Sequence, residues 1–475
     1  MNTSTASTAP AASSVQTPSA PAVALPRVAI ACQGGGAHTA FTAGALAYLF
    51  LACEHFRATL PAMPFRIGGL SGTSGGAITA AMAWSQTHPA HGGDHDDNWA
   101  EGAARVLRYW NRNKATLDPR DKSPLWWGDY LMNLGTQWSM AAQELLPLKN
   151  PPPSAFVSSL VQSRMKEDMR KSLGLAPHAE HFHGRPGVDL YVGAVDVVNP
   201  ASSPQAAFRA FPEWPAEGVR MDELLASACI PELFVAGPLV VNKTAGVEGE
   251  RVQRYFWDGL YSQNPPISNF FAGKKRDEKP DLLWVIQINP DHYEGRDTGP
   301  QTPRQQEDRR NELAGNLSLG QELRALDTLN KVARDLDKLR KELAQLKKHN
   351  GELPEAHKFK PVPGLPTALQ PYKQVAVNFI RLGSRTTGPL AEFELDYASK
   401  LNRDPAFIDA LMADGIQQAF EAARAGKLGR SSRHMRVSIR FPKLQQLDWP
   451  SPAQLGERLA DPELRAQWAR LCAAL

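Results

Sequence analysis

Two segments of this chain repeat the same order of features: a short apolar run, a glycine cluster and an apolar segment of helical length. The first contains "VAIA" (28–31), a triple glycine (34–36) and then a stretch rich in Ala, Leu and Phe. The second runs from Phe65 through "GLSGTSGG" (69–76) into "AITAAMAW" (77–84). Each order predicts a strand, a tight turn and a helix. Two such units in succession predict an α/β fold with a mostly parallel central sheet and crossover helices.

Later segments predict more of this sheet. Nearly continuous apolar or β-branched runs at 188–198, 281–289 and 375–382 are typical of interior strands that are covered on both faces. The segment "HMRVSIRF" (434–441) alternates apolar and polar residues and predicts a half-exposed strand, antiparallel or at an edge. A last helix is predicted over 404–426, with Asp as N-cap, Pro in the first turn and Gly at the end.

Composition narrows the class of protein. The chain has 475 residues, of which 42% are hydrophobic and 21% charged, as in ordinary globular proteins. The net charge of +4 permits mild attraction to anionic surfaces but argues against a nucleic-acid partner. The four cysteines form no CxxC pair, so we expect reduced thiols and a cytoplasmic protein rather than a disulfide scaffold or zinc ribbon. No window predicts a membrane span.

The chain divides into four expected parts. Residues 1–26 are rich in Ala, Ser, Thr and Pro, lack the basic start of a secretory signal and predict a disordered tail. Residues 27–295 form the expected core. Residues 296–360 form a helical segment with a linker that begins at "HNGELP" (349–354), and residues 361–475 form a C-terminal α/β extension that packs on the core.

Leucines, with one valine, recur at spacings of three and four over residues 323–346 and predict an amphipathic helix. Lysines and arginines fill its polar face. The pattern favours packing on the body of the protein or on a partner helix. It also allows oligomer formation, or peripheral contact with a membrane surface.

The second turn has the spacing of a nucleophile elbow, Gly72-x-Ser74-x-Gly76. A serine on such a strained turn projects its hydroxyl at the carboxyl end of the sheet, and the flanking glycines avoid collision with the neighbouring strand and helix. Ser74 is a better candidate nucleophile than Ser71, which precedes the turn and is expected to hydrogen-bond locally. An ordinary Gly/Ser turn is the alternative, because the motif also occurs by chance.

The triple glycine Gly34-Gly35-Gly36 is able to turn backbone N–H groups toward an anion. A dinucleotide loop needs GxGxxG, whereas Thr39 stands three positions after the last glycine, and a P-loop needs a lysine that is missing here. An oxyanion hole needs only the N–H groups, to which the N–H of Gly75 would be added. This interpretation agrees best with a serine nucleophile on the next strand.

The base for this serine is predicted to be Asp258 in "YFWDGLYSQNPPI" (255–267), at a strand end, with Gly259 allowing a close approach. Apolar surroundings make a carboxylate a stronger base. A plain Asp-Gly turn is the alternative.

The histidine-rich stretches at 88–97 and 178–184 are typical of solvated loops, and we expect no metal and no cofactor. A Ser-His-Asp triad through His292 remains open.

Together these motifs resemble the patatin-like phospholipases, a family with a glycine-rich oxyanion loop, a GxSxG elbow and a distal Asp-Gly motif. The resemblance covers residues 27–295 and includes "LLASACIPELF" (224–234). It implies a three-layer α/β/α fold and a Ser/Asp dyad of Ser74 and Asp258. The later region resembles the extension of some bacterial members.

Two positions depart from the family pattern. His38 stands where the family usually has Arg or Lys, and Leu260 stands where it has Gly or Ala.

The resemblance implies a serine acyl hydrolase that acts on a lipid or another acyl ester. The alternatives are a thioesterase or storage-polyester hydrolase on the same dyad, or a non-catalytic lipid-associated scaffold. The aromatic segment 124–140 is interpreted as core, or as a lid or acyl groove.

Overall fold

The described part of the chain covers most of the predicted core and extension. A computed structural model describes residues 25–85, 98–115, 133–134, 155–198, 207–231, 233–244, 249–290, 299–300, 302–353, 357–358, 372–383 and 388–475. Nearly all of the predicted tail, the histidine-rich stretch 88–97, His292 and most of the aromatic segment 124–140 lie outside these residues. The predictions made for them stay predictions.

An eight-stranded sheet forms the centre of the molecule, with the order β10-β9-β1-β2-β4-β8-β7 and with β5 paired to β4. The strands are β1 (Arg27–Cys32), β2 (Arg66–Thr73), β4 (Asp189–Asp196), β5 (Phe208–Phe211), β7 (Pro238–Asn242), β8 (Arg251–Asp258), β9 (Leu282–Gln287) and β10 (Ala376–Arg381). From β10 to β4 the neighbours are parallel, and β8, β7 and β5 pair antiparallel. The predicted α/β class, the parallel sheet and the strands at 28–31, 188–198, 281–289 and 375–382 are confirmed. A separate small sheet pairs β3 (His181–Phe182) with β6 (Val219–Arg220).

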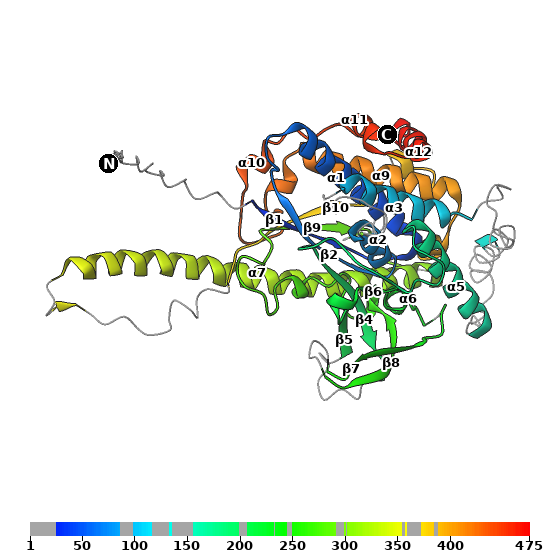
Figure 1. The fold of residues 1–475 in the computed structure, drawn as a ribbon, viewed down its shortest axis with the longest axis horizontal. Coiled ribbons are helices and arrows are strands. Elements are labelled where there is room, and N and C mark those ends of the chain that lie inside the picture. The colour runs from blue at the N-terminus through cyan, green and yellow to red at the C-terminus, as the bar shows by residue number, and fades with distance from the viewer. Residues whose placement is uncertain are drawn as a thin grey trace, which may run out of the picture.

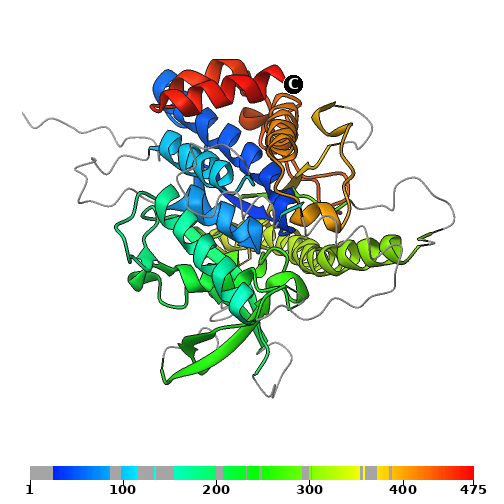
Figure 2. The same ribbon diagram turned by 90° about the vertical axis from the view of Figure 1, so that its right-hand side faces the viewer.

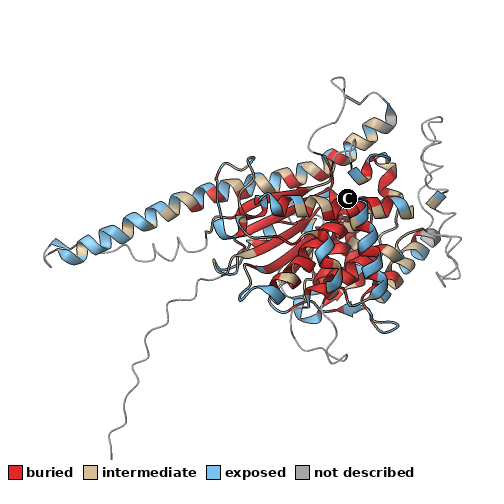
Figure 3. Ribbon diagram, turned by 90° about the horizontal axis from the view of Figure 1, so that it is seen from above, coloured by how far each residue is buried: buried red, intermediate tan, exposed pale blue. Residues whose placement is uncertain are grey.

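Helices cover both faces of this sheet. Figure 1 and Figure 3 show α1, α2, α3 and α9 on one face and the long helix α7 along the other. The helices are α1 (Ala40–Thr59), α2 (Gly75–Trp84), α3 (Trp99–Arg112), α5 (Ala155–Ser172), α6 (Met221–Ser227), α7 (Pro303–Glu352), α9 (Pro405–Arg424), α10 (Pro442–Gln445), α11 (Pro452–Leu455) and α12 (Pro462–Ala473). The arrangement is a mixed α/β fold with a helical C-terminal region, compatible with three layers.

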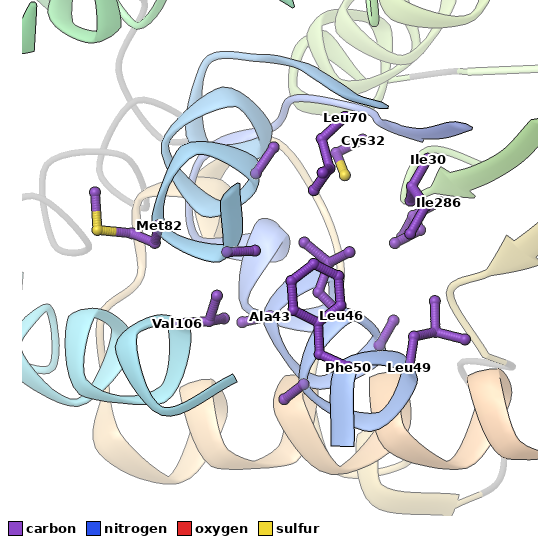
Figure 4. Close-up of a cluster of buried hydrophobic side chains, with 14 of the residues drawn as sticks. Ile30, Cys32, Ala43, Leu46, Leu49, Phe50, Leu70, Met82, Val106 and Ile286 are labelled. Carbon is purple, nitrogen blue, oxygen red and sulfur yellow. The ribbon is translucent and has the colours of Figure 1, made fainter. Parts of the chain in front are cut away.

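Successive side chains of each strand point to opposite faces of the sheet, and the two faces form two separate hydrophobic cores. Side chains on one face of β1, such as Ile30, join the cluster under α1, whereas Ala29 and Ala31 face a smaller cluster with Leu319 and Leu326 of α7. Figure 4 shows part of the larger cluster, with labelled side chains from β1, β2 and β9 and from α1, α2 and α3. Because both faces are covered, most residues of the parallel strands are buried, including polar ones such as Ser71 and Thr73.

Helix α1 lies in the larger core, and most of its residues are buried. The stretch Gly36–Thr59 is long and apolar enough to cross a membrane by length and composition, which corrects the expectation that no such window exists. Within the structure, 94% of its most apolar window is buried. A core helix of a soluble protein passes the same test, so the stretch is weak evidence for a membrane span.

The C-terminal region continues the core. β10 extends the sheet beyond β9, and α9 lies beside α1 with α12 close by (Figures 1 and 2). The Asp404 side chain caps α9 by accepting the N–H groups of Ala406 and Phe407, and Gly426 follows the helix in a left-handed conformation. The predicted helix is confirmed, while the domain boundaries stay predictions.

The predicted strand at 434–441 is wrong. Its apolar residues do turn inward, with Val437 buried and Met435 partly buried. However, the only pairing described there is an isolated bridge between Arg430 and Arg440. The alternation of apolar and polar residues alone predicted a strand, but among the described residues no neighbouring strand forms a ladder of hydrogen bonds with this segment.

Helix α7 extends beyond both ends of the predicted segment 323–346. Its N-terminal part, as far as Ala333, is buried against the body through Leu319, Leu326 and Ala333. The second half projects from the body (Figures 1 and 3), and Leu346 is 51% exposed. The predicted linker start at 349 is wrong, because residues 349–352 continue the helix. Oligomer formation and membrane contact through this helix stay predictions.

Candidate active site

Ser74 lies at the sharp turn between β2 and α2. Its backbone has φ 55° and ψ −130°, a conformation that a residue with a side chain rarely adopts. The side chain is 6% exposed. The Ser74 N–H donates to Ser227 Oγ (2.9 Å), and Ser227 Oγ in turn donates to the Gly193 carbonyl (2.6 Å). The strained turn is thus held by α6 and β4.

The elbow glycines are required by backbone contacts. A Cβ at Gly72 would lie 2.5 Å from the carbonyl oxygen of Gly76. A Cβ at Gly76 would lie 2.6 Å from the carbonyl oxygens of both Cys32 and Gln33. These distances are far below van der Waals contact, so the turn closes only with glycine at both positions.

Asp258 and Ser74 lie at the ends of two strands, β8 and β2, that pair end to end along one edge of β4. On one edge, β4 pairs in parallel with β2 up to Gly193–Thr73, and antiparallel with β8 from the next residue, where Ala194 faces Asp258. The carboxyl ends of β2 and β8 therefore point toward each other. A Cβ at Gly259 would lie 2.4 Å from the Gly193 carbonyl oxygen, which explains the glycine after Asp258.

The Asp258 carboxylate is 1% exposed, and its Oδ1 accepts the N–H of Leu260 (2.8 Å). Its backbone N–H donates to the Cys229 carbonyl (2.9 Å). Burial, and then the negative charge of Asp258, raise the pKa of the Cys229 thiol to about 11. This thiol is therefore protonated at neutral pH and does not compete as a nucleophile.

The triple glycine packs directly on the serine turn, because a Cβ at Gly34 would lie 2.4 Å from the Thr73 carbonyl oxygen. The Gly34 N–H donates to Asn264 Oδ1 (2.6 Å), so this predicted oxyanion donor is already engaged. No acceptor is described for the N–H groups of Gly35 and Gly36, or for Gly75 at the start of α2. These three remain candidate donors.

One pocket joins Ser74, Asp258 and the triple glycine, whereas Gly75 is not part of its lining. It is lined by Gly34, Gly35, Gly36, Ser74, Ile230, Leu233, Asp258, Leu260, Asn311, Tyr397, Lys400 and Leu401. Its free volume is about 30 Å³, against roughly 10–15 Å³ for one water molecule on the same measure. It has room for a reacting carbonyl group, and a long acyl chain must extend beyond the described walls.

Several of these residues escaped the sequence reasoning. Asn311 and Lys400 come from distant parts of the chain, and no motif marks them. Asn264, which accepts the Gly34 N–H, lies in the stretch 255–267 quoted for Asp258 but was not singled out. Ser227, Ile230 and Leu233 lie within "LLASACIPELF" (224–234), where a small-residue and proline pattern was the only signal.

Other candidates lie away from the reaction centre. Ser71 is buried within β2, and its hydroxyl makes no hydrogen bond to the described residues, contrary to the expected local bond. His38 is buried, and its Nε2 lies 2.7 Å from Ser399 Oγ. Among the described residues, no group of His, Cys, Asp and Glu is arranged to hold a metal ion.

A scan of the sequence against protein-family models finds no match, and a search of curated proteins finds none either. The resemblance to the patatin-like phospholipases therefore depends on the sequence motifs alone, and the catalytic roles of these residues stay predictions.

Proposed function

We propose that the protein is a serine acyl hydrolase of the patatin-like type, which cleaves a lipid or other acyl ester with a Ser74–Asp258 dyad. The observation that carries this proposal is the conformation of Ser74. A residue held at φ 55° and ψ −130° costs on the order of 1–3 kcal/mol, and such strain clusters at active sites. In this protein the strained Ser74 lines the same pocket as the buried Asp258 carboxylate and as Gly35 and Gly36, whose N–H groups have no described acceptor.

In the proposed reaction, Asp258 accepts the proton of the Ser74 hydroxyl while Ser74 Oγ forms a bond to the ester carbonyl carbon. The negative charge that develops on the carbonyl oxygen would be stabilised by N–H groups of Gly35, Gly36 and Gly75. The intermediate then collapses, the carbon–oxygen bond to the alcohol breaks, and the alcohol leaves with the proton from Asp258. An acyl ester of Ser74 remains.

Water completes the cycle. Asp258 accepts a proton from water as the water oxygen attacks the acyl carbon, and Ser74 leaves with that proton as the carboxylic acid is released. The N-terminus of α2, on which Ser74 sits, favours the negative charge in both halves of the reaction. Ile230 and Leu233 supply an apolar wall suited to an acyl group.

The test is hydrolysis by the purified protein of a panel of phospholipids, lysophospholipids, neutral esters, thioesters and polyester oligomers. We expect Asp258→Asn to lower kcat/KM for the best substrate by about 10³–10⁴-fold without unfolding. Ser71→Ala is the matched control and should keep activity, because Ser71 lies inside β2 away from the pocket. Full activity in Asp258→Asn would refute the dyad.

The panel also separates the alternatives on the same dyad. Preference for thioesters or polyester oligomers would change the substrate class and keep the mechanism. No described residue of the pocket lining is a histidine, and activity lost in His292→Ala but retained in Asp258→Asn would favour the triad. Peripheral membrane contact is part of the proposal, and sedimentation with lipid vesicles tests it.

A further inference from the structure

The C-terminal half of α7 carries a stripe of large apolar side chains that face water. Leu339 is 41% exposed and Leu346 is 51% exposed, and Leu329 and Val332 are exposed to a similar degree. Figure 3 shows this half of the helix projecting from the body, with exposed and intermediate residues along its length. Because water solvates apolar surface poorly, a continuous exposed stripe of this kind marks an interaction site.

The stripe follows a seven-residue repeat. Its residues alternate at spacings of three and four, as the a and d positions of a coiled coil do when the seven positions are lettered a to g. We call this stripe the α7 seam, and it consists of Leu329, Leu336 and Leu343 at position a and Val332, Leu339 and Leu346 at position d.

The body of the protein packs on a different side of α7. Ala333, at position e, is buried. At position b, Asn330 bonds the backbone N–H and carbonyl of Val375. The next b residue, Asp337, accepts a hydrogen bond from Gln374 Nε2 (3.1 Å). With about 3.6 residues per turn, position b lies about 130° around the helix from the middle of the seam. The seam therefore faces away from these contacts.

The charged residues that flank the seam distinguish between partners. Asp335 and Glu342 occupy position g, and Arg340 and Lys347 occupy position e. When two parallel copies pair in register, each g residue lies beside the e residue that stands five positions later in the other copy. Asp335 would then meet Arg340, and Glu342 would meet Lys347. Both contacts join opposite charges.

Other partners agree less well with this charge pattern. An antiparallel pair would place g beside g and e beside e, so that acidic residues meet acidic ones and basic residues meet basic ones. Such like-charge contacts are unfavourable. Helices that lie on an anionic membrane have a basic polar face, whereas Asp335 and Glu342 line one border of this seam. The pattern therefore favours a second copy of this chain, in parallel orientation.

We infer that the C-terminal half of α7 is a dimerisation helix, which forms a parallel two-stranded coiled coil with the same helix of a second copy. The body occupies the adjoining e and b positions, which leaves room for one partner helix. An isolated helix must first pay a costly nucleation step, but here the buried N-terminal part of α7 already holds the helix in place. The inference is independent of the proposed hydrolase function.

Sedimentation velocity of the full chain at about 1–100 µM measures the association. We expect a dimer with a Kd on the order of 10 µM or tighter. Leu339→Asp should raise the Kd at least about tenfold, because it buries an unpaired charge in the seam. Leu317→Asp is the matched control: Leu317 is 61% exposed on the same helix, at position c outside the seam, and this variant should still form the dimer. Circular dichroism checks that each variant keeps its helix content.

A charge reversal tests the orientation. Glu342→Lys should raise the Kd about 5- to 30-fold at low salt, because it sets two pairs of like charges against each other. Adding Lys347→Glu to the same chain should restore the affinity. Lys348→Glu is the matched control, since position f points away from the seam, and it should leave the Kd near that of the wild type. In an antiparallel pair both the single and the double variant would keep like charges in contact, so no such restoration would be seen.

Each contrary outcome has a definite meaning. A monomeric wild type over the whole concentration range, or a dimer that survives Leu339→Asp, would overturn the inference. A monomer that sediments with vesicles of anionic phospholipid, and loses this binding in Leu339→Asp, would overturn it and assign the seam to a membrane. A trimer or tetramer that depends on Leu339 would contradict the two-stranded form. Equal Kd values for Glu342→Lys and the double variant would contradict the parallel orientation.

Discussion

The turns after β1 and β2 follow neighbouring parallel strands and are both rich in glycine, yet only the second is strained. The first turn places glycines at positive φ, with Gly36 at 56°. The second places a serine there, Ser74 at 55°. Glycine adopts this conformation at little cost, and serine does not. The first turn is therefore relaxed and presents N–H groups, whereas the second is strained and presents a hydroxyl.

The two turns also interlock. Gly76 of the second turn touches the carbonyl oxygens of Cys32 and Gln33 at the end of β1, and Gly34 of the first touches the Thr73 carbonyl oxygen at the end of β2. The two turns therefore pack directly on each other. In this site glycine allows two backbone segments to come into close contact, whereas backbone strain is confined to Ser74, the residue proposed to react.

Breaking the interlock should have the largest effect. Gly76→Ala places a Cβ 2.6 Å from two carbonyl oxygens that have no room to move, and we expect a loss of about 3 kcal/mol or more in the free energy of unfolding. Gly320→Ala is the control, because nothing lies within 4 Å of a Cβ there. It should stabilise α7 by about 0.5–1 kcal/mol. Urea unfolding measures both, and equal effects would contradict the interlock.

Asn264→Ala tests the occupied donor of the first turn. It leaves the buried Gly34 N–H without its acceptor, and we expect a loss of about 1–3 kcal/mol together with reduced esterase activity. Asn330→Ala is the matched control: Asn330 is buried too and bonds the Val375 backbone away from the pocket. It should lose stability and keep activity. Equal activity in the two variants would show that Asn264 does not order the loop.

The strain at the second turn is tested by comparing Ser74→Gly with Ser74→Ala. Both lose the hydroxyl, but only glycine adopts φ 55° and ψ −130° without strain. Ser74→Gly should therefore be more stable than Ser74→Ala by about 1–2 kcal/mol. Identical thermal unfolding of the two would mean that the turn is not strained in solution.

The smallest effect is expected at a strand end outside the pocket, where the Gly383 N–H after β10 donates to Asp414 Oδ2 (2.7 Å). Burial raises the pKa of Asp414 to about 6. Because the folded state binds this proton more tightly than the unfolded state, the stability it contributes is present below about pH 4 and is lost as the pH rises through about 6.

Asp414→Asn should remove that pH dependence and raise stability above pH 6 by an amount on the order of 1 kcal/mol. The gain is moderated because a neutral acceptor makes a weaker bond to Gly383. Unfolding curves from about pH 4 to pH 8 measure the slope. An unchanged slope in the variant would assign the dependence to another group.

The parts of this comparison that depend on local sequence could be predicted, and the parts that depend on long-range contacts could not. Glycine spacing and apolar runs predict both strand-to-helix units, because turn geometry is set by neighbouring residues. The predicted strand at 434–441 failed, because burial alternation does not reveal whether a partner strand is present. Asn264 follows the Asp-Gly motif, but nothing in the sequence shows that it accepts the Gly34 N–H. Lys400 reaches the pocket from η9 (Ala398–Leu401), and its sequence surroundings carry no signal.

The same limit explains the oxyanion loop. The triple glycine predicts a loop with N–H groups to offer, but the engagement of Gly34 by Asn264 depends on a residue 230 positions away. Asp258 was found because its Asp-Gly motif is local. That β2 and β8 meet end to end on the edge of β4 emerges only from the topology of the sheet.

The central claim is that Ser74 is an activated nucleophile, and covalent labelling tests it most directly. The protein is treated with a fluorophosphonate probe, and the modified peptide is identified by mass spectrometry. We predict one adduct on Ser74, absent in Ser74→Ala, formed much more slowly in Asp258→Asn and unchanged in Ser71→Ala. Unlabelled Ser74 in folded wild-type protein, or equal labelling of wild type and Asp258→Asn, would contradict the account.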